Sequence, residues 1–184
     1  MTLALGPVER VVPLALAGDE AAFRWIVETF SSDMRQVAYV VCGSLDLAEE
    51  AVAASWPIAW QKLAALREPA SLRSWLVAIA ANEGRRLAKR RANRAIREIP
   101  VDDPEHGPTA ALAARSTGDD REALLDLAHA LAGLDPADRA LLALRYVAGL
   151  NSTELARATG LTPSGTRARL QRLLERLRRE LRDD

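Results

Sequence analysis

The sequence predicts an all-α protein built of two small helical domains joined by a flexible acidic linker. Three observations lead to this fold class. Apolar residues recur at helical spacing in segment after segment, and no segment shows the alternation expected of a β-strand. Ala, Leu and Arg, which favour helices, are plentiful, while aromatic residues make up only 4%. A stretch rich in proline, glycine and acids, residues 99–118, interrupts the helical pattern.

Length and composition exclude several classes of protein. The 184 residues suit one ordinary domain or two small ones, and 49% hydrophobic residues suffice for real cores. The single cysteine, Cys42, permits no internal disulfide and fits a reducing cytosol, so a cytoplasmic protein is expected. The N-terminus, MTLALGPVERVVPLALAGDE, lacks a basic region and its apolar run is broken, so neither a signal peptide nor a membrane span is expected.

The first helix is predicted over residues 19–41, with Asp19 as its N-cap and Gly43 as its terminator. A second helix should begin at Ser44-Leu45-Asp46 and run to about Leu66. Pro57 lies in its interior and should kink or split it, because proline removes a backbone hydrogen bond.

A third helix is predicted from near Pro69 into a basic block. Although the formal net charge is +0, residues 85–97 hold seven basic side chains and no acid, and residues 167–182 hold seven arginines against two glutamates. The acids gather between these blocks, in residues 100–126. Such segregation of charge is more informative than the sum. We therefore divide the chain into a first domain (1–98), a linker (99–118) and a second domain (119–184).

The second domain should contain three capped helices. Asp135-Pro136 starts one that covers residues 136–147 and ends before Gly149. Asn151 and Glu154 form a capping box for a short helix over residues 152–158. Thr159-Gly160-Leu161 makes a tight turn, and Thr162-Pro163 starts the last helix. The apolar stripe of that helix consists of Leu170, Leu173, Leu174, Leu177 and Leu181.

A short helix, a turn containing glycine and a longer helix form a helix-turn-helix pattern, in which the start of the second helix enters the major groove of DNA. Arginine there can bind a guanine edge, and later arginines are better placed for phosphates. The candidate DNA-binding residues are Ser164, Thr166, Arg167, Arg169, Arg172 and Arg176. An ordinary solvated amphipathic helix has the same alternation of Leu and Arg, so both interpretations stay open here.

The predicted third helix carries a second candidate surface. Asn82 follows Trp75 by seven residues and so shares its helical face, beside the basic block. Trp75 could stack on an unpaired base and Asn82 could bind a base edge. The competing interpretation is that Trp75, like Trp56 and Trp60, belongs to the core and that Asn82 is merely solvated.

No catalytic set is visible, so an enzyme is not expected. His106 and His129 lie far apart without cysteines at metal-ligand spacing, and Cys42 is interpreted as a small buried hydrophobe. Neither a phosphate-binding loop nor a dinucleotide-binding glycine motif occurs. We expect no cofactor, no metal and no small-molecule substrate.

Four segments together resemble the sigma-70 family of bacterial RNA polymerase, specifically its small extracytoplasmic-function class. AFRWIVETF resembles the opening helix of the sigma-2 domain, and DLAEEAVAASWPIAW resembles D-x-A-E-D-x-V-Q-E-x-F-x-x-x-W. LRSWLVAIAANEGRRLAKRR resembles F-x-x-W-L-x-x-I-A-x-N-x-x-x-D-x-x-R. LDPADRALLALRYVAGLNSTELARATGLTPSGTRARLQRLLERLR resembles the sigma-4 pattern position after position.

The resemblance implies a promoter-specificity subunit with RNA polymerase core and promoter DNA as partners. Sigma-2 would melt the minus-ten element and capture non-template bases, and sigma-4 would recognise the minus-thirty-five element as duplex. An anti-sigma factor is typical of this class, but nothing in the sequence specifies one. Because no further segment follows the last helix, regulation by a fused domain is not expected.

Individual residues take their expected roles from the matched motifs. Asn82 matches the family asparagine associated with the captured minus-ten base. The basic helix beside it is matched by Arg85, Arg86, Lys89 and Arg90, and the clamp-binding helix by Glu49 and Glu50. Arg167 and Arg169 match the Lys and Arg of the K-S-R segment.

This chain departs from the family pattern at four places. The Q-E pair of the clamp-binding helix is Ala53-Ala54, and Pro57 follows in the same helix. Both departures bear on the contact with core polymerase. The acid four residues after the asparagine is Arg86, and the valine of the recognition helix is Thr166.

Two other functions compete with the promoter-specificity subunit. A stand-alone helix-turn-helix regulator would bind duplex DNA tightly without polymerase, often at a palindrome. A purely protein-binding helical module would show no salt-sensitive affinity for nucleic acid. The basic helix next to Asn82 favours the promoter-specificity subunit, because a dimerisation domain has no need of it.

Overall fold

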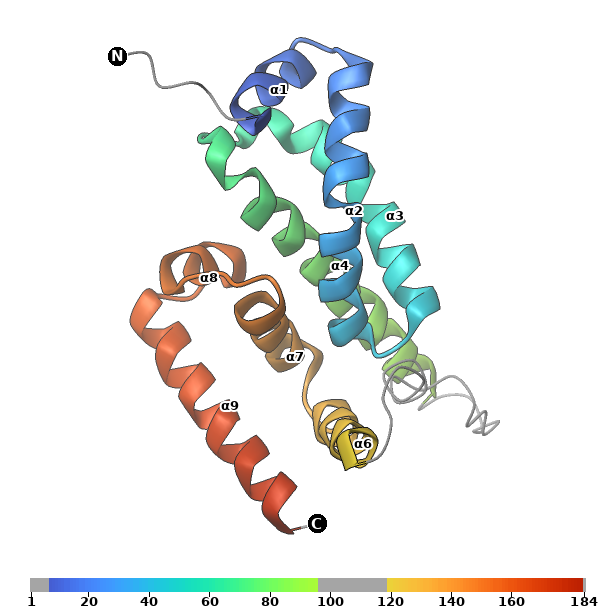
Figure 1. Cartoon of the computed structure of the whole chain (residues 1–184), viewed down its shortest axis with the longest axis vertical. Coiled ribbons are helices and arrows are strands. Elements are labelled where there is room, and N and C mark those ends of the chain that lie inside the picture. Colours follow the sequence, from blue (N-terminus) through green and yellow to red (C-terminus); the bar gives the residue numbers. More distant parts are fainter. Residues whose placement is uncertain (1–6, 96–118, 184) are drawn as a thin grey trace.

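The computed structural model describes residues 7–95 and 119–183, and every regular element in these two ranges is helical (Figure 1). Each range forms its own group of helices, so the predicted all-α class with two small helical domains is confirmed. The predicted linker, residues 99–118, lies outside the described residues, and so does Arg97 of the basic block. The domain boundaries themselves stay a prediction.

The first domain begins with α1 (Pro7–Leu16), a helix that the sequence analysis did not predict because Pro13 and the charged residues interrupt its apolar pattern. Its buried residues are Val12 and Ala15. The predicted helix over residues 19–41 is α2 (Glu20–Cys42), and both of its caps are confirmed. The Asp19 carboxylate accepts hydrogen bonds from two backbone amides, and Gly43 ends the helix at a φ of 70°, where glycine is favoured.

The second predicted helix is α3 (Leu45–Lys62), followed by the short 3₁₀ turn η1 (Leu63–Ala65). Pro57 does not split it, because the helix continues for five residues beyond the proline. The carbonyl that loses its partner belongs to Ala53, which is exposed, so water can satisfy it. Of the two effects predicted for Pro57, a kink or a split, the split was therefore wrong.

The third predicted helix is confirmed as the 3₁₀ turn η2 (Pro69–Ser71) leading into α4 (Leu72–Ala95). Helices α2, α3 and α4 pack on one another and enclose the core of the first domain. Its largest fully buried side chains are Ile26, Met34, Leu72, Leu76, Val12, Val37, Val41 and Val77. Burying one such side chain contributes about 1.5–3 kcal/mol, so this core stabilises the scaffold that carries Trp75 and Asn82.

The second domain consists of α6 (Asp119–Ala132), α7 (Pro136–Leu142), η4 (Ala143–Val147), α8 (Ser152–Thr159) and α9 (Pro163–Asp183). The predicted helix over residues 136–147 is thus α7 followed by the single π-helical turn η4. The wider turn ends with the Ala148 amide donating to the Ala143 carbonyl at 3.0 Å. Arg145 then donates to the Leu150 carbonyl at 2.8 Å, which fixes the chain where it enters α8.

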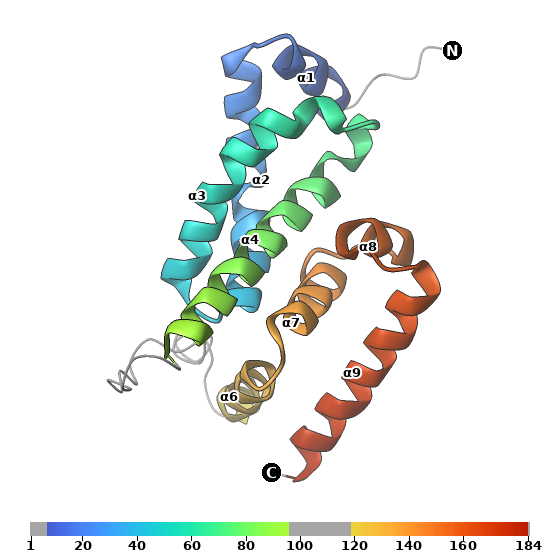
Figure 2. The ribbon, with the colours of Figure 1, turned by 180° about the vertical axis from the view of Figure 1, so that it is seen from behind.

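Helix α7 lies between the two domains, and Figures 1 and 2 show it from opposite sides. It contacts α2 and α4 of the first domain and α9 of its own. Two arginines bridge the domains through backbone carbonyls. Arg139 donates from Nε to the Val41 carbonyl at 2.9 Å, and Arg73 donates from Nη1 to the Ala148 carbonyl at 2.6 Å. Asp33 pairs with Arg73 from the other side.

Cys42 lies where α2 approaches α4 closely. Its thiol donates to the Gly84 carbonyl at 3.5 Å, and a Cβ on Gly84 would come within 3.2 Å of the sulfur. Gly84 therefore permits this close packing of the two helices. Burial raises the pKa of the Cys42 thiol to about 11, although the nearby Arg139 guanidinium acts in the opposite direction.

We predict that Cys42 reacts slowly with alkylating reagents in the folded protein. A thiol with a pKa of about 11 instead of 9.0 carries roughly 100-fold less thiolate at pH 8. Iodoacetamide should accordingly modify the native chain at least that much more slowly than the urea-unfolded chain. Equal rates in the two states, followed by mass spectrometry, would contradict the buried setting of this thiol.

Candidate nucleic-acid interface

Helices α8 and α9 form the predicted helix-turn-helix, and its predicted caps are confirmed. Asn151 accepts hydrogen bonds from the backbone amides of Thr153 and Glu154, and the Glu154 carboxylate accepts one from the Asn151 amide at 2.9 Å. Gly160 ends α8 at a φ of 72°. The Thr162 hydroxyl accepts from the Gly165 amide at 3.0 Å and so starts α9. The turn between the helices is thereby fixed by the chain's own hydrogen bonds.

The buried face of α9 holds this helix against its domain. Leu170, Leu173 and Leu177 are buried as the predicted stripe requires, while Leu174 is half-buried and Leu181 is exposed. Thr166 is 0% exposed, and its hydroxyl donates to the Thr162 carbonyl at 3.0 Å. Its side chain therefore faces the protein, where the family pattern has valine, and does not reach a groove.

The outward face of α9 carries the groups that can meet DNA. Ser164 and Arg167 are exposed near its start, and Arg172 is exposed one turn later. The Ser164 hydroxyl lies 3.2 Å from that of Thr162. Neither Arg167 nor Arg172 is paired with an acid of the described residues, so both guanidinium groups can turn toward phosphates or bases.

Two other predicted arginines of α9 are engaged within the protein. Arg169 contacts Asp138 of α7, with Nη2 at 2.6 Å from the carboxylate. Arg176 pairs with Glu180 one turn along α9 at 2.8 Å. The Arg176 pair is an exposed i,i+4 contact, which DNA phosphates could readily replace. The Arg169 pair is less exposed and joins two helices.

Gln171, on the outward face of α9, is a further candidate that was not among the predicted DNA-binding residues. Gln171 is exposed and lies four residues after Arg167, on the same side of the helix. Its amide donates to Glu175 at 3.0 Å. Glutamine can make paired hydrogen bonds with adenine, so helical spacing from Arg167 was a signal that could have identified it.

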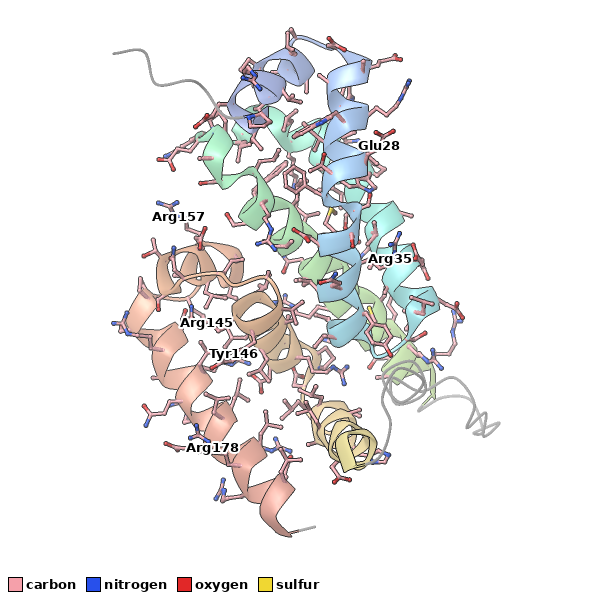
Figure 3. All side chains as sticks on the ribbon, in the orientation of Figure 1. Glu28, Arg35, Arg145, Tyr146, Arg157 and Arg178 are labelled. Atoms are coloured by element: carbon pink, nitrogen blue, oxygen red, sulfur yellow. The ribbon has the colours of Figure 1, made fainter. Side chains whose placement is uncertain are left out.

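Trp75 and Asn82 lie together in the structure, as their spacing on one helical face predicts. Both line a cavity of about 570 Å³ whose opposite wall is formed by α8 of the second domain. Arg157, labelled in Figure 3, belongs to this wall. Trp75 is half-buried and Asn82 is exposed. An aromatic face beside an amide is the combination that stacks on a base and bonds its edge.

The basic helix beside Asn82 is partly exposed. Arg86, Lys89 and Arg90 are exposed, and Arg85 is half-buried. Arg86 forms an ion pair with Glu83 on the same helix. This contact keeps its guanidinium along the helix surface, next to Asn82.

The predicted polymerase-contacting residues lie on α3. Glu49 and Glu50 are exposed, and Glu49 pairs with Arg35 of α2 at 2.6 Å. Ala53 is exposed and Ala54 is half-buried, so the two alanines leave a small, uncharged surface beside the acids.

Trp56 and Trp60 of α3 form an aromatic cluster with Phe23, but only Trp56 packs against the core as the core interpretation predicts. Phe23 of α2 lies edge-on to Trp60 and to Trp56, with ring centroids 4.7 Å and 6.0 Å apart respectively. Trp60 is nevertheless 44% exposed.

Within residues 7–95 and 119–183, no helix is long and apolar enough to cross a bilayer.

Comparison with known families matches both domains. The model of Sigma-70 region 2 matches residues 26–95, and that of Sigma-70, region 4 matches residues 124–177. The chain is also 28% identical over 177 residues to RfaY, a probable RNA polymerase sigma factor of Xanthomonas campestris pv. campestris. That alignment covers 92% of this chain and 43% of the relative, so the chain spans less than half of the relative's length.

Solved structures share the fold. CnrH, in complex with the cytosolic domain of CnrY, is 21% identical with a TM-score of 0.69, and the match covers 97% of this chain and 99% of CnrH. The sigma factor RpoE of Bartonella quintana, in complex with the anti-sigma factor NepR, is 20% identical with a TM-score of 0.64. That match covers 88% of this chain and 98% of RpoE.

Proposed function

The chain belongs to the sigma-70 family, in its extracytoplasmic-function class, and from this premise we propose that it binds core RNA polymerase and directs promoter-specific initiation of transcription. One observation supports this function most strongly. A half-buried tryptophan and an exposed asparagine lie beside a basic helix in a domain separate from the helix-turn-helix. A stand-alone regulator needs no such second surface for nucleic acid.

Each of the two surfaces binds one promoter element. The outward face of α9 binds the minus-thirty-five element as duplex, with Arg167 at base edges and Arg172 at phosphates. On α4, Trp75 and Asn82 capture an unpaired base of the minus-ten element, and Arg85, Arg86, Lys89 and Arg90 hold its backbone. Catalysis belongs to the polymerase, so this chain acts as a non-enzymatic, cytoplasmic subunit.

In the arrangement of the described residues, α8 restricts the space beside Trp75 and Asn82. Helix α8 walls the cavity that Trp75 and Asn82 line, so an unpaired strand reaches them freely only when the second domain moves away. The contacts to break include those of Arg73 and Arg139 with carbonyls across the interface. Binding to core polymerase, which holds the two domains at separate promoter elements, supplies the free energy for this separation.

Contact with core polymerase is assigned to α3. Glu49 and Glu50 carry the charge of this surface, and Ala53-Ala54 replace the polar pair of the family pattern. An anti-sigma factor is a further proposed partner, because RpoE of Bartonella quintana is seen with one.

Reconstituted transcription tests the proposed function. The chain is mixed with sigma-free bacterial core polymerase and fragmented genomic DNA, and RNA start sites are mapped. Discrete starts that share two upstream motifs at fixed spacing are expected. Core binding without starts would indicate a missing activator or a weakened contact at Ala53-Ala54. Neither core binding nor starts, with tight duplex binding by the chain alone, would establish the stand-alone regulator instead.

Replacing Arg167 should change promoter preference. Arg167→Ala is expected to cost about 1–3 kcal/mol in binding and to relax specificity at one position of the minus-thirty-five element, because an arginine that reads a base edge is lost. Binding to a panel of single-base variants measures this. An equal loss on every sequence would show a phosphate contact.

Replacing Asn82 should impair promoter opening more than duplex binding. Asn82→Ala removes the amide proposed to bind the captured base, while α9 still holds the duplex. A fluorescent base analogue in the minus-ten region reports opening, and a duplex that ends upstream of this region reports binding. Opening at the wild-type rate would rule out base capture by Asn82.

A further inference from the structure

We propose that Arg169 is a positioning residue rather than a DNA-reading one. Its ion pair with Asp138 holds the first half of α9 against α7, so that the outward face of α9 meets the groove at a fixed angle. This inference rests on the proposed function of the helix-turn-helix, and it assigns different roles to two arginines that the family motif treats alike.

The geometry of the pair favours a structural contact. Arg169 Nε donates to Asp138 Oδ1 at 2.7 Å, and Nη2 lies 2.6 Å from the same oxygen. The Asp138 side chain is only 18% exposed and that of Arg169 is 37% exposed. Because water is partly excluded, this charge-assisted contact is stronger than the exposed pair of Arg176 with Glu180. To reach DNA, Arg169 would have to abandon a carboxylate that water cannot fully resolvate.

Asp138 is itself a fixed anchor. It lies in the first turn of α7, where the positive end of the helix dipole favours a carboxylate. Asp135 caps that turn by accepting from the Ala137 amide at 2.7 Å. The following residues of α7, Ala140, Leu141 and Leu142, are buried. The anchor therefore stays in place whether or not DNA is bound.

Helical geometry separates Arg169 from Arg167. Residues two apart in a helix differ by about 200° around its axis, so these two arginines project from opposite flanks of α9. Arg169 lies closer to the buried face, since Thr166 and Leu173, three residues before it and four after it, are both buried. Exposed Gln171 lies four residues after Arg167, so it shares the flank of Arg167 and not that of Arg169.

The two roles predict opposite effects of removing Asp138. If Arg169 reads DNA, Asp138→Ala frees it and removes a negative charge, so binding should hold or tighten. If Arg169 positions α9, the same substitution loosens the helix and binding should weaken. A displaced α9 weakens all of its contacts with DNA together, so the loss of affinity should be equal for every promoter sequence.

The experiment compares full-length variants on one promoter duplex, bound as the complex with core polymerase. The duplex is the minus-thirty-five region mapped by reconstituted transcription. Asp138→Ala and Arg169→Ala should each lose about tenfold or more in affinity, the loss typical of a charge-assisted hydrogen bond. The double variant should lose no more than either single one. Arg169→Lys should recover part of the affinity.

Asp126→Ala is the matched control. It removes the same charge from α6, where Asp126 is paired with none of the described residues, and it should bind at least as well as the wild type. Single-base variants of the duplex complete the comparison, because Arg169→Ala should leave base preference unchanged.

Two results would overturn the positioning role. One is wild-type or tighter binding by Asp138→Ala together with relaxed preference at a single base in Arg169→Ala. The other is additive loss in the double variant. A wild-type chain without promoter-selective binding would refute the proposed function instead. Thermal unfolding then tests separately whether Arg169 and Asp138 are coupled. If they are, the double variant should have a Tm no lower than that of either single variant. If they act independently, the two decreases in Tm should add.

Discussion

Two consecutive residues of α7, Asp138 and Arg139, contact other helices on two sides of α7. Asp138 binds Arg169 of the recognition helix, and Arg139 binds the Val41 carbonyl at the end of α2 and the Ala132 carbonyl at the end of α6. Adjacent residues of a helix project about 100° apart, so a short helix can contact elements on two sides. The placement of the helix-turn-helix against the first domain depends on this arrangement.

Arg139 satisfies backbone groups that their own helices leave unpaired. The last carbonyls of a helix lack intrahelical donors and carry the negative end of its dipole, which a guanidinium complements. Burial lowers the pKa of Arg139, while the nearby Cys42 and Asp135 act against this shift. Arginine keeps its charge in such a setting, because its ordinary pKa lies far above neutrality. These polar contacts accompany apolar packing, because buried residues of both domains, including Val41, Leu141 and Leu144, belong to one hydrophobic cluster.

The same interface lies between the two proposed nucleic-acid surfaces. Trp75 and Asn82 line a cavity whose opposite wall is α8, although Asn82 itself is exposed. Contacts of Arg73 and Arg139 with carbonyls are few and directional, and water can replace them once the domains part. Because buried apolar residues of both domains also form one cluster, separating the domains carries a cost that the proposed binding to core polymerase would have to offset.

Local rules made most helices predictable. Asp19, Asn151 and Thr162 act as caps because their side-chain oxygens reach amides two or three residues away, and such contacts depend on neighbouring sequence alone. The split predicted at Pro57 does not occur, since α3 continues to Lys62. Helical spacing predicted one continuous helix over residues 136–147 and gave no sign of the π-helical turn η4.

The sequence by itself determined the all-α class, the helix-turn-helix, the shared face of Trp75 and Asn82, and the family. Helical periodicity, capping and motif spacing are all properties of residues near one another in the chain. Only the tertiary structure decided that Thr166 faces inward, that Arg169 is bound to Asp138, and that α8 lines the same cavity as Asn82. Asp138 and Arg169 are thirty-one residues apart in sequence, and no local rule states which charges meet when helices pack.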